Sequence, residues 1–382
     1  MYDSIVIGCG FAGVVAAREL AEQKGEKVLI IESRDHIGGN CYDKKDDHGI
    51  LIHQYGPHIF HTNSKRVYDY LSRFTKWYEF EHKVVGKIHG MELPIPFNLN
   101  SLQMVYGDRA PALEKKLIDY FGEGARVPIL ELMNHEDADL KEIAAYVYEN
   151  IFLKYTMKQW GKSPKDIDPA VSGRVPVLLS HDDRYFQDTY QGLPLEGYTA
   201  VFEKLLVHDG IDVRLGCQGK EVLRLAPDGD TKVYFEGEPF TGKVIFTGAL
   251  DEFFDCCYGR LPYRSLDFKF EHYDKPFYQS HGVVNYTVSE DFTRITEFKY
   301  LSGQMDAKDT TIVKEYPMAY SGGGGQIPYY AINNEQNDAL YGKYKRIVDR
   351  ISGFYLLGRL AEYKYYNIDA IVERALDLAE RV

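Results

Sequence analysis

The stretch "IVIGCGFAGVVAAREL" (residues 5–20) decides the fold. Residues 4–7 read as a short buried strand, and Gly8, Gly10 and Gly13 follow with the spacing G-x-G-x-x-G as a helix begins. The first glycine permits a tight turn, the second lets backbone approach a pyrophosphate, and the third lets helix and strand pack closely. Amide groups at the helix start then favour an anion. The stretch therefore predicts a dinucleotide site.

The sequence that follows supports this prediction. "KVLIIE" (residues 27–32) reads as a second buried strand, and its last residue, Glu32, lies about 20 residues past the glycines, where a carboxylate can accept hydrogen bonds from a ribose. The next loop, "SRDHIGGNCYD", contains Gly39 and Asn40 and resembles the loop that lies along FAD in flavoproteins of the glutathione-reductase type. No second G-x-G-x-x-G is present, which argues against a separate NAD(P)H domain.

Bulk properties limit the class of protein. A chain of 382 residues predicts two or three domains. The net charge of -12 disfavours broad binding to nucleic acid or to an anionic membrane. The five cysteines are odd in number and lack C-x-x-C spacing, which is typical of reduced thiols. Because the sequence offers neither a membrane span nor a signal peptide, we expect a soluble cytoplasmic protein.

Periodicity suggests how the remainder is organised. Apolar residues in 137–161 recur at helical spacing and, with 66–74 and 112–122, predict a helical insertion. Residues 244–250 read as a returning strand of the dinucleotide fold. Three stretches alternate as antiparallel strands do, and the C-terminal 30 residues read as a strand, a glycine turn and a helix. The alternating stretches are "HGVVNYTV", "FTRITEFKYL" and "DTTIVKEYP".

Nine stretches together resemble one family, the UDP-galactopyranose mutases of the bacterial type. In chain order they are "GGNCYD", "YGPHIFHT", "KYTMKQWG", "GRVPVLLSHDDRYF", "YQGLPLEGYT", "YGRLPYRSLDF", "TRITEFKY", "PYYAIN" and "GRLAEYKYYNIDAI". The resemblance implies an α/β fold with a discontinuous FAD-binding Rossmann-like domain, a small helical domain with a mobile substrate loop, and a twisted antiparallel β-sheet domain. The expected ranges are 1–70, 197–262 and 345–382 for FAD binding, 98–184 for the helices, and 71–97, 185–196 and 263–344 for the sheet.

The resemblance also implies a reaction. The family interconverts UDP-galactopyranose and UDP-galactofuranose, a ring contraction without net redox change that nevertheless needs reduced FAD. N5 of the reduced flavin is the implied nucleophile on C1 of the sugar as UDP leaves, so the cofactor performs covalent catalysis. A homodimer that serves the synthesis of cell-envelope polysaccharide is the implied assembly and role.

The family motifs assign roles to individual residues. Arg174 and Arg294 would clamp the diphosphate and stabilise charge on departing UDP. Asn367 stands where many members of the family carry Asp. The substrate residues implied by the resemblance are Phe152, Tyr155, Thr156, Trp160, Tyr185, Asn285, Tyr330, Tyr365 and Asn367. The implied cofactor residues are Gly8, Gly10, Gly13, Glu32, Gly39, Asn40, His58, Arg359, Tyr366 and Ile368.

The segment "HQYGPHIFH" raises the question of a metal site. His53, His58 and His61 lie close in sequence, but Gly56 and Pro57 interrupt any helix and no carboxylate is spaced to join them. We therefore expect no metal. By resemblance, His58 lies near the isoalloxazine of FAD and is a candidate proton shuttle.

Two other classes of protein share the fingerprint. An FAD-dependent amine-oxidase-like oxidoreductase would oxidise its substrate. It would not need paired arginines beside aromatic side chains that stack on a nucleotide base. A non-enzymatic binding protein of the GDP-dissociation-inhibitor type has this fold without flavin chemistry, and the intact glycines with Glu32 argue against it.

Overall fold

A computed structural model describes residues 2–161, 176–225 and 232–382. The chain forms two compact units. Unit 1 comprises Met1–Glu79, Asp188–Tyr263 and Pro328–Val382, and unit 2 comprises Phe80–Gln187 and Arg264–Ile327. Unit 1 contains every stretch expected to bind FAD, and unit 2 contains the stretch expected to be helical. The division into three domains stays a prediction.

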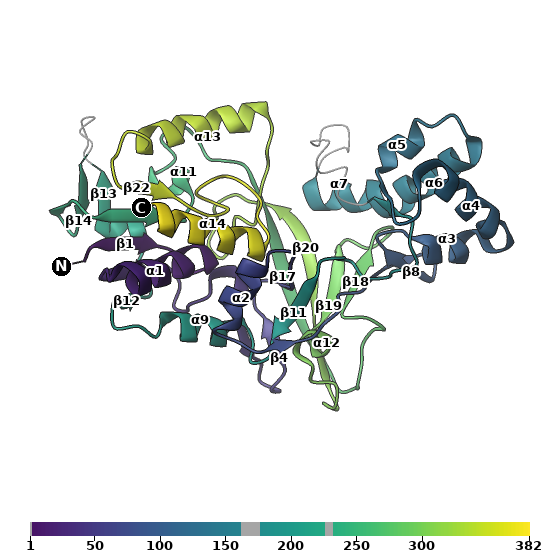
Figure 1. Ribbon diagram of the computed structural model, residues 1–382, viewed down its shortest axis with the longest axis horizontal. Helices are drawn as coiled ribbons and strands as arrows, with labels where there is room; N and C mark the ends of the chain where they lie inside the picture. The colour runs from purple at the N-terminus through teal and green to yellow at the C-terminus, as the bar shows by residue number, and fades with distance from the viewer. Residues whose placement is uncertain (1, 162–175, 226–231) are drawn as a thin grey trace. The chain divides into compact units, whose positions relative to one another are not determined.

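The core of unit 1 is a five-stranded parallel sheet (Figure 1). Its central strands are buried along their whole length, as parallel strands covered on both faces must be. The strands come from three separate stretches of sequence, so the fold is discontinuous. In spatial order they are β12 (Ile211–Arg214), β2 (Val28–Ile31), β1 (Ser4–Ile7), β16 (Lys243–Phe246) and β22 (Phe354–Leu356).

Two long helices from opposite ends of the chain pack together in unit 1. Helix α1 (Phe11–Lys24) has small buried residues that allow a close approach, and α14 (Ile368–Arg381) contacts it with its own buried apolar residues. Helix α2 (Lys65–Ser72) packs on α14, where Arg66 pairs with two carboxylates of that helix at 2.6 Å. The helix expected at 66–74 therefore belongs to unit 1 and not to the helical insertion.

Further helices and strands complete unit 1. They form the small sheets β3–β4, β5–β11–β6 and β13–β14–β15 and connect the core strands. Their bounds are η1 (Gly39–Cys41), β3 (Asp43–Lys45), β4 (Leu51–His53), β5 (Phe60–Thr62), β6 (Trp77–Tyr78), β11 (Tyr190–Pro194), α9 (Tyr198–Leu206), α10 (Gly219–Val222), β13 (Leu223–Leu225), β14 (Val233–Phe235), β15 (Glu238–Phe240), α11 (Leu250–Phe253), β21 (Tyr330–Ala331) and α13 (Glu335–Val348).

Unit 2 is built on a mixed sheet. Its strands pair antiparallel except for β18 and β7, which run parallel, so the expected antiparallel sheet is correct for all but one of these pairs. In spatial order the strands are β17 (Tyr263–Tyr273), β20 (Thr310–Ala319), β19 (Arg294–Glu297), β18 (Val283–Tyr286), β7 (Val84–Ile88) and β8 (Met91–Ile95).

Most of the helices between residues 99 and 160 share one apolar core with β7 and β8, to which Ile88, Leu93 and Ile95 contribute. A short pair of strands, β9 (Arg126–Val127) and β10 (Val177–Leu178), lies beside them. The helices are α3 (Leu99–Tyr106), η2 (Gly107–Arg109), α4 (Ala110–Phe121), α5 (Ile129–Met133), α6 (Ala138–Val147), the π-helix η3 (Tyr148–Leu153) and α7 (Lys154–Trp160).

Two local features differ from the sequence predictions. The helix expected at 137–161 contains the π-helical segment η3, a rare geometry that is often found at functional sites. The strand expected at 292–301 ends at Glu297 and continues as α12 (Phe298–Ser302). The Glu297 carboxylate accepts the N–H groups of Tyr278 and Gln279 at 2.8 and 2.9 Å, a loop contact that alternation cannot reveal.

Among the described residues, no helix is both long enough and apolar enough to cross a bilayer.

Candidate active-site residues and cofactor cavity

A cavity of about 770 Å³ lies in unit 1 at the carboxyl ends of the parallel strands. This is where open α/β sheets bind ligands. Gly13 is the one predicted cofactor residue that does not line it. The predicted residues that do are Gly8, Gly10, Glu32, Gly39, Asn40, His58, Arg359, Tyr366, Asn367 and Ile368.

The glycines form a cradle in which a side chain has no room. Gly8 has a φ of +106°, and a Cβ atom there would lie 2.0 Å from the hydroxyl oxygen of Thr247. A Cβ on Gly13 would lie 2.0 Å from the carbonyl oxygen of Gly8, so Gly13 sets the contact between helix and strand. A Cβ on Gly39 would lie 3.0 Å from the Cα of Gly10, which means that the two glycine-containing loops touch. Backbone is thus exposed to the cavity from both loops.

Glu32 directly follows β2, and its carboxylate is fixed at the cavity. Its Oε2 accepts the N–H of Cys9 at 2.8 Å, its Oε1 accepts the N–H of Arg34 at 3.0 Å, and the residue is 7% exposed. The Ser33 hydroxyl also donates to Oε1 at 3.1 Å. Because a carboxylate offers about four lone-pair positions, capacity for one ribose hydroxyl remains. The arrangement fits the adenosine end of a dinucleotide.

Arg34 is a cavity residue that the sequence analysis missed. Its Nη2 donates to Asn40 Oδ1 at 2.8 Å, and its guanidinium lies 4.3 Å from the ring centroid of Tyr55. Its Nη1 is buried, and within the described part of the chain it has no hydrogen-bond partner. A buried guanidinium N–H without a partner at a cavity fits an anionic or hydroxylated ligand. The sequence feature that points to Arg34 is its position two residues after Glu32.

Two helix N-termini meet this cavity. The first N–H groups of α1 and of α14 lack partners within their own helices, and the cavity is lined by residues at both helix starts. Such groups and the helix dipole attract a diphosphate. Asn367 is the N-cap of α14, although its side chain makes no capping hydrogen bond.

His58 is held in one orientation at the cavity. Its Nδ1 lies 2.9 Å from the carbonyl oxygen of Gly56, and its backbone N–H donates to His53 Nδ1 at 3.1 Å. Because a carbonyl can only accept, Nδ1 of His58 carries a proton. In the neutral ring Nε2 is then the acceptor.

The predicted residues Arg359, Tyr330 and Tyr365 form a group of one cationic and two aromatic side chains in unit 1. The guanidinium of Arg359 lies 4.5 Å from the ring centroid of Tyr365, and its Nε donates to the carbonyl of Tyr366 at 2.7 Å. The rings of Tyr330 and Tyr365 stack with centroids 6.0 Å apart. Tyr365 is 44% exposed.

The other predicted substrate residues belong to unit 2. Asn285, Arg294 and Glu315 lie directly opposite one another on β18, β19 and β20 and therefore share one face of the sheet. The Nε of Arg294 donates to Glu315 Oε1 at 2.6 Å, and Glu315 is 1% exposed. Burial raises the pKa of this carboxyl, and Arg294 opposes the rise. Glu315 has no sequence motif that points to it, because its contact depends on strand register.

A second group of predicted substrate residues in unit 2 comes from η3, from α7 and from the segment around Tyr185. Phe152 and Thr156 are buried, and Phe152 is part of the apolar core. Burial raises the pKa of Tyr155 to about 12, against the effect of Arg294, so Tyr155 stays a phenol at neutral pH. The ring of Tyr185 lies 4.9 Å from that of Phe186 in an edge-to-face contact.

Helix α7 is held against the mixed sheet of unit 2 by hydrogen bonds. The ammonium of Lys158 donates to the carbonyl of Tyr286 at 2.8 Å, and Arg264 Nε donates to the carbonyl of Gln159 at 2.8 Å. Trp160 ends α7, and Arg174 lies outside the described residues.

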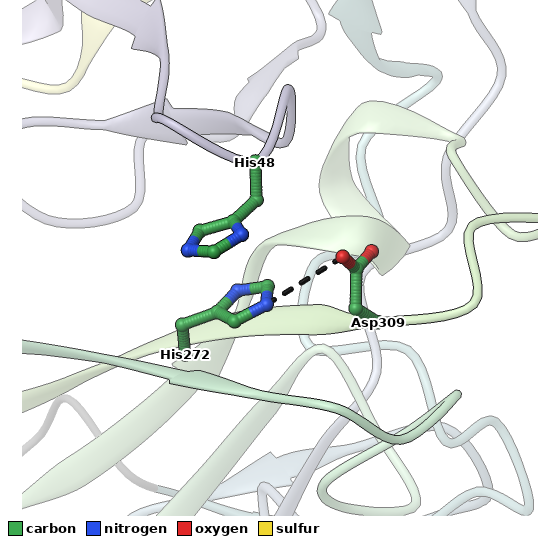
Figure 2. A group of neighbouring side chains, drawn as sticks. All are labelled: His48, His272 and Asp309. Atoms are coloured by element: carbon green, nitrogen blue, oxygen red, sulfur yellow. Dashed lines mark ion pairs between the residues drawn. The ribbon is translucent and has the colours of Figure 1, made fainter.

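Metal ligands were not expected. Figure 2 draws His48, His272 and Asp309, side chains of types that can bind a metal. His272 Nε2 and Asp309 Oδ2 lie 3.5 Å apart within unit 2, whereas His48 belongs to unit 1. Of the three histidines considered from sequence, His61 pairs through Nδ1 with Asp188 at 3.0 Å. The absence of a metal stays a prediction.

Comparison with known proteins gives family matches. The sequence profile of UDP-galactopyranose mutase matches residues 150–365, more than half of the chain, and that of the NAD(P)-binding Rossmann-like domain matches residues 6–74. A UDP-galactopyranose mutase of Mycoplasma pneumoniae is 34% identical over 100% of this chain and 96% of its own length. A dTDP-fucopyranose mutase of Escherichia coli is also 34% identical, over 100% of this chain and 98% of its own length.

Solved structures share the fold. A reduced UDP-galactopyranose mutase superposes with a TM-score of 0.72 at 15% identity and covers 100% of this chain and 93% of its own. A putrescine oxidase variant superposes with a TM-score of 0.55 at 13% identity, covering 100% and 98%. The α/β Rossmann-like fold is thus confirmed, and it is common to enzymes with different chemistry.

Proposed function

Because the chain belongs to the UDP-galactopyranose mutase family of flavin-dependent isomerases, we propose that it interconverts UDP-galactopyranose and UDP-galactofuranose with reduced FAD. The observation that carries the proposal is the cavity of unit 1, which is lined by all predicted cofactor residues except Gly13. The homodimer and the cytoplasmic location expected from the sequence remain predictions.

The protein's own residues would hold the cofactor. Glu32 would accept hydrogen bonds from the adenosine ribose, and the first amides of α1 with Arg34 would bind the diphosphate. Arg359, His58 and the start of α14 would lie along the flavin end. The chemistry that reduced FAD supplies when bound is nucleophilic, from N5 to C1 of the sugar, with no net change in redox state.

The substrate residues would orient the nucleotide and steady its charge. Arg294, oriented through Nε by Glu315, would bind the diphosphate of departing UDP, and Arg174 would complete the clamp. The protonated phenol of Tyr155 would donate a hydrogen bond. The remaining residues proposed for the nucleotide and sugar are Phe152, Thr156, Trp160, Tyr185, Asn285, Tyr330, Tyr365 and Asn367.

A second candidate substrate follows from one specific observation. The chain is as similar to a dTDP-fucopyranose mutase as to a UDP-galactopyranose mutase, with full-length identity of 34% to each. The reaction would be the same ring contraction, with thymine in place of uracil and with fucose in place of galactose. We rank it second because the matching family profile is that of UDP-galactopyranose mutase.

One assay separates the candidates. The protein is incubated with UDP-galactofuranose, or with dTDP-fucofuranose, each with and without dithionite, and the pyranose product is measured by chromatography. We expect conversion of the UDP-sugar only after reduction. Faster conversion of the dTDP-sugar would favour the second substrate, and equal turnover without reductant would reject the role of reduced flavin. Oxygen consumption with an amine, or failure to bind FAD, would reject the mutase altogether.

A further inference from the structure

A buried histidine outside the predicted site connects to the cofactor cavity. His53 ends β4, is 4% exposed, and accepts the backbone N–H of His58 with Nδ1 at 3.1 Å. An imidazole nitrogen that accepts a hydrogen bond carries no proton. The contact therefore requires His53 to be neutral with its proton on Nε2.

The hairpin that carries His53 is hydrogen-bonded to the start of α9. Asp43 lies directly opposite His53 in the β3–β4 pair, and its carboxylate accepts the backbone N–H groups of Tyr198 and Thr199 at 2.5 and 2.8 Å. The Thr199 hydroxyl also donates to the carbonyl of Asp43 at 2.7 Å. The start of α9 thus fixes the hairpin, and the hairpin fixes the histidine.

The segment between His53 and His58 depends on this support. Gly56 has a φ of +82°, and its carbonyl faces Nδ1 of His58 at 2.9 Å. His58 itself is 8% exposed, so water cannot readily replace a lost partner of its N–H group. The ring of Tyr198 packs edge-on against the ring of His53, with the ring centroids 5.7 Å apart. The His53 ring is therefore also held by a contact from α9.

We propose that His53 is a positioning residue, whose Nδ1 holds the Gly56–Pro57–His58 segment so that the ring of His58 lies correctly at the cofactor cavity. The inference rests on the proposed function only in taking the ligand of that cavity to be FAD. His53 itself does not line the cavity and acts through His58.

Three substitutions test which atom matters. In His53→Asn the amide oxygen can occupy the place of Nδ1, in His53→Gln the amide reaches the place of Nε2, and in His53→Leu neither atom is replaced. Asparagine and glutamine are both polar, so this pair is informative even where the leucine variant fails to fold. His61→Leu is the control, because it removes a neighbouring histidine whose ring pairs with Asp188 and does not line the cavity.

The first measurement is amide hydrogen exchange over residues 54–60 in the full-length protein, with and without FAD. We expect exchange to be roughly tenfold faster in His53→Gln and His53→Leu, the factor that loss of one ordinary hydrogen bond gives. His53→Asn and His61→Leu should stay within about twofold of the original protein, as small packing changes do. Amide hydrogen exchange is measured without a sugar substrate and without turnover, so its result does not depend on the proposed reaction.

The second measurement is the flavin absorption spectrum, the dissociation constant of FAD, and kcat and KM with UDP-galactofuranose. We expect His53→Gln to shift the spectrum and lower kcat about tenfold with little change in KM, and His53→Asn to restore both. Equal behaviour of the asparagine and glutamine variants, or a better glutamine variant, would overturn the proposal. If no variant or original protein turns over the sugar, the proposed function fails, while the exchange and spectral results still decide on His53.

Discussion

Arg294 Nε donates to Oε1 of Glu315 at 2.6 Å across the β19–β20 pair, and Glu315 is 1% exposed. Asn285 lies opposite Arg294 on the other side, in the β18–β19 pair. The guanidinium is therefore oriented by a buried carboxylate on the neighbouring strand of the sheet. Burying the Glu315 carboxylate costs free energy of desolvation. That cost fits a site that needs the positive charge of Arg294 in one fixed position.

The Arg294→Ala substitution tests this arrangement directly. We expect turnover to fall at least ~100-fold, because a donor that stabilises the leaving group is lost, and Arg174→Ala should cost a similar factor. Arg294→Ala should also lower the free energy of unfolding by about 3 kcal/mol, since Glu315 stays buried without its partner. Steady-state kinetics and urea unfolding measure the two effects.

Lys314→Ala provides a matched control for Arg294→Ala. Lys314 precedes Glu315 on β20 and so points to the other face of the sheet, where it pairs with Glu271 at 2.7 Å. Its removal also breaks an ion pair but should leave turnover unchanged. A similar loss of turnover in Lys314→Ala would mean that the sheet, and not the guanidinium, is responsible.

The stability of Arg294→Ala should depend on pH in a defined direction. Burial raises the pKa of Glu315 above its ordinary 4.5, and Arg294 opposes the rise, so the pKa is higher still in the variant. A carboxyl with a raised pKa in the folded state costs stability as the pH rises through that pKa. We therefore expect the difference in urea midpoint between the original protein and the variant to be larger at pH 8 than at pH 5.

Adding Glu315→Gln to the variant checks the origin of this effect. The amide cannot ionise, so the difference in midpoint should no longer grow with pH, and part of the lost stability should return. An unchanged pH dependence in the double variant would assign the effect to another group.

Gly13→Ala should abolish flavin binding. The added Cβ would lie 2.0 Å from the carbonyl oxygen of Gly8 and 2.9 Å from Val6 Cγ1, so strand and helix must separate at the cavity. Gly342→Ala in α13 is the control, because the nearest atom is 3.8 Å away and alanine is the better helix former by ~0.5–1 kcal/mol. Absorbance of flavin per mole of purified protein compares them, and normal flavin content in Gly13→Ala would contradict the argument.

Local signals made the first part of the fold predictable. The strand Ser4–Ile7, the glycines and Glu32 lie within one short stretch, and each has a distinct steric or hydrogen-bonding reason to be there. Distant segments were predictable only as far as their motifs resemble those of a family. Arg359 and Ile368 line the same cavity as Gly10 although most of the chain separates them.

The missed residues depend on contacts that no local pattern encodes. Glu315 matters because strand register sets it opposite Arg294, and His53 matters because a hairpin turns its ring toward a backbone N–H. Arg34 was visible in the sequence, but its unsatisfied Nη1 appears only when the cavity is known. Likewise, β19 ends at Glu297, whose carboxylate accepts the N–H of Tyr278 from a segment that is distant in sequence.

Asn367→Asp tests what the neutral amide does in this chain. A carboxylate at the N-cap of α14 should stabilise the helix by ~0.3–1 kcal/mol through the helix dipole. If Asn367 lies near the substrate diphosphate, the added charge should raise KM for the UDP-sugar about fivefold at low salt and less at high salt. Asn367→Ser is the neutral control, and an equal rise in KM for both variants would remove charge as the cause.

The last prediction concerns the pH dependence that His53 gives to folding. Burial lowers the pKa of His53, and the facing carboxylate of Asp43 opposes this only in part, while Tyr198 and His58 face the ring from α9 and from its own segment. The neutral ring is thus favoured in the folded protein, whereas the unfolded chain takes up a proton near pH 6.5. Stability from His53 is complete above that pH and declines as the pH falls toward the lower folded pKa, by up to ~1.4 kcal/mol per pH unit.

His53→Asn removes this titration and keeps the hydrogen-bond acceptor. The variant should therefore lose less stability than the original protein between pH 7.5 and pH 5, as measured by urea unfolding at each pH. His61→Asn serves as the comparison, because it makes the same substitution at a nearby histidine, whose ring pairs with Asp188. Parallel pH profiles for the original protein and His53→Asn would show that His53 takes up its proton at the same pH in the folded protein as in the unfolded chain, and would contradict the argument that burial and the contact with His58 keep its ring neutral.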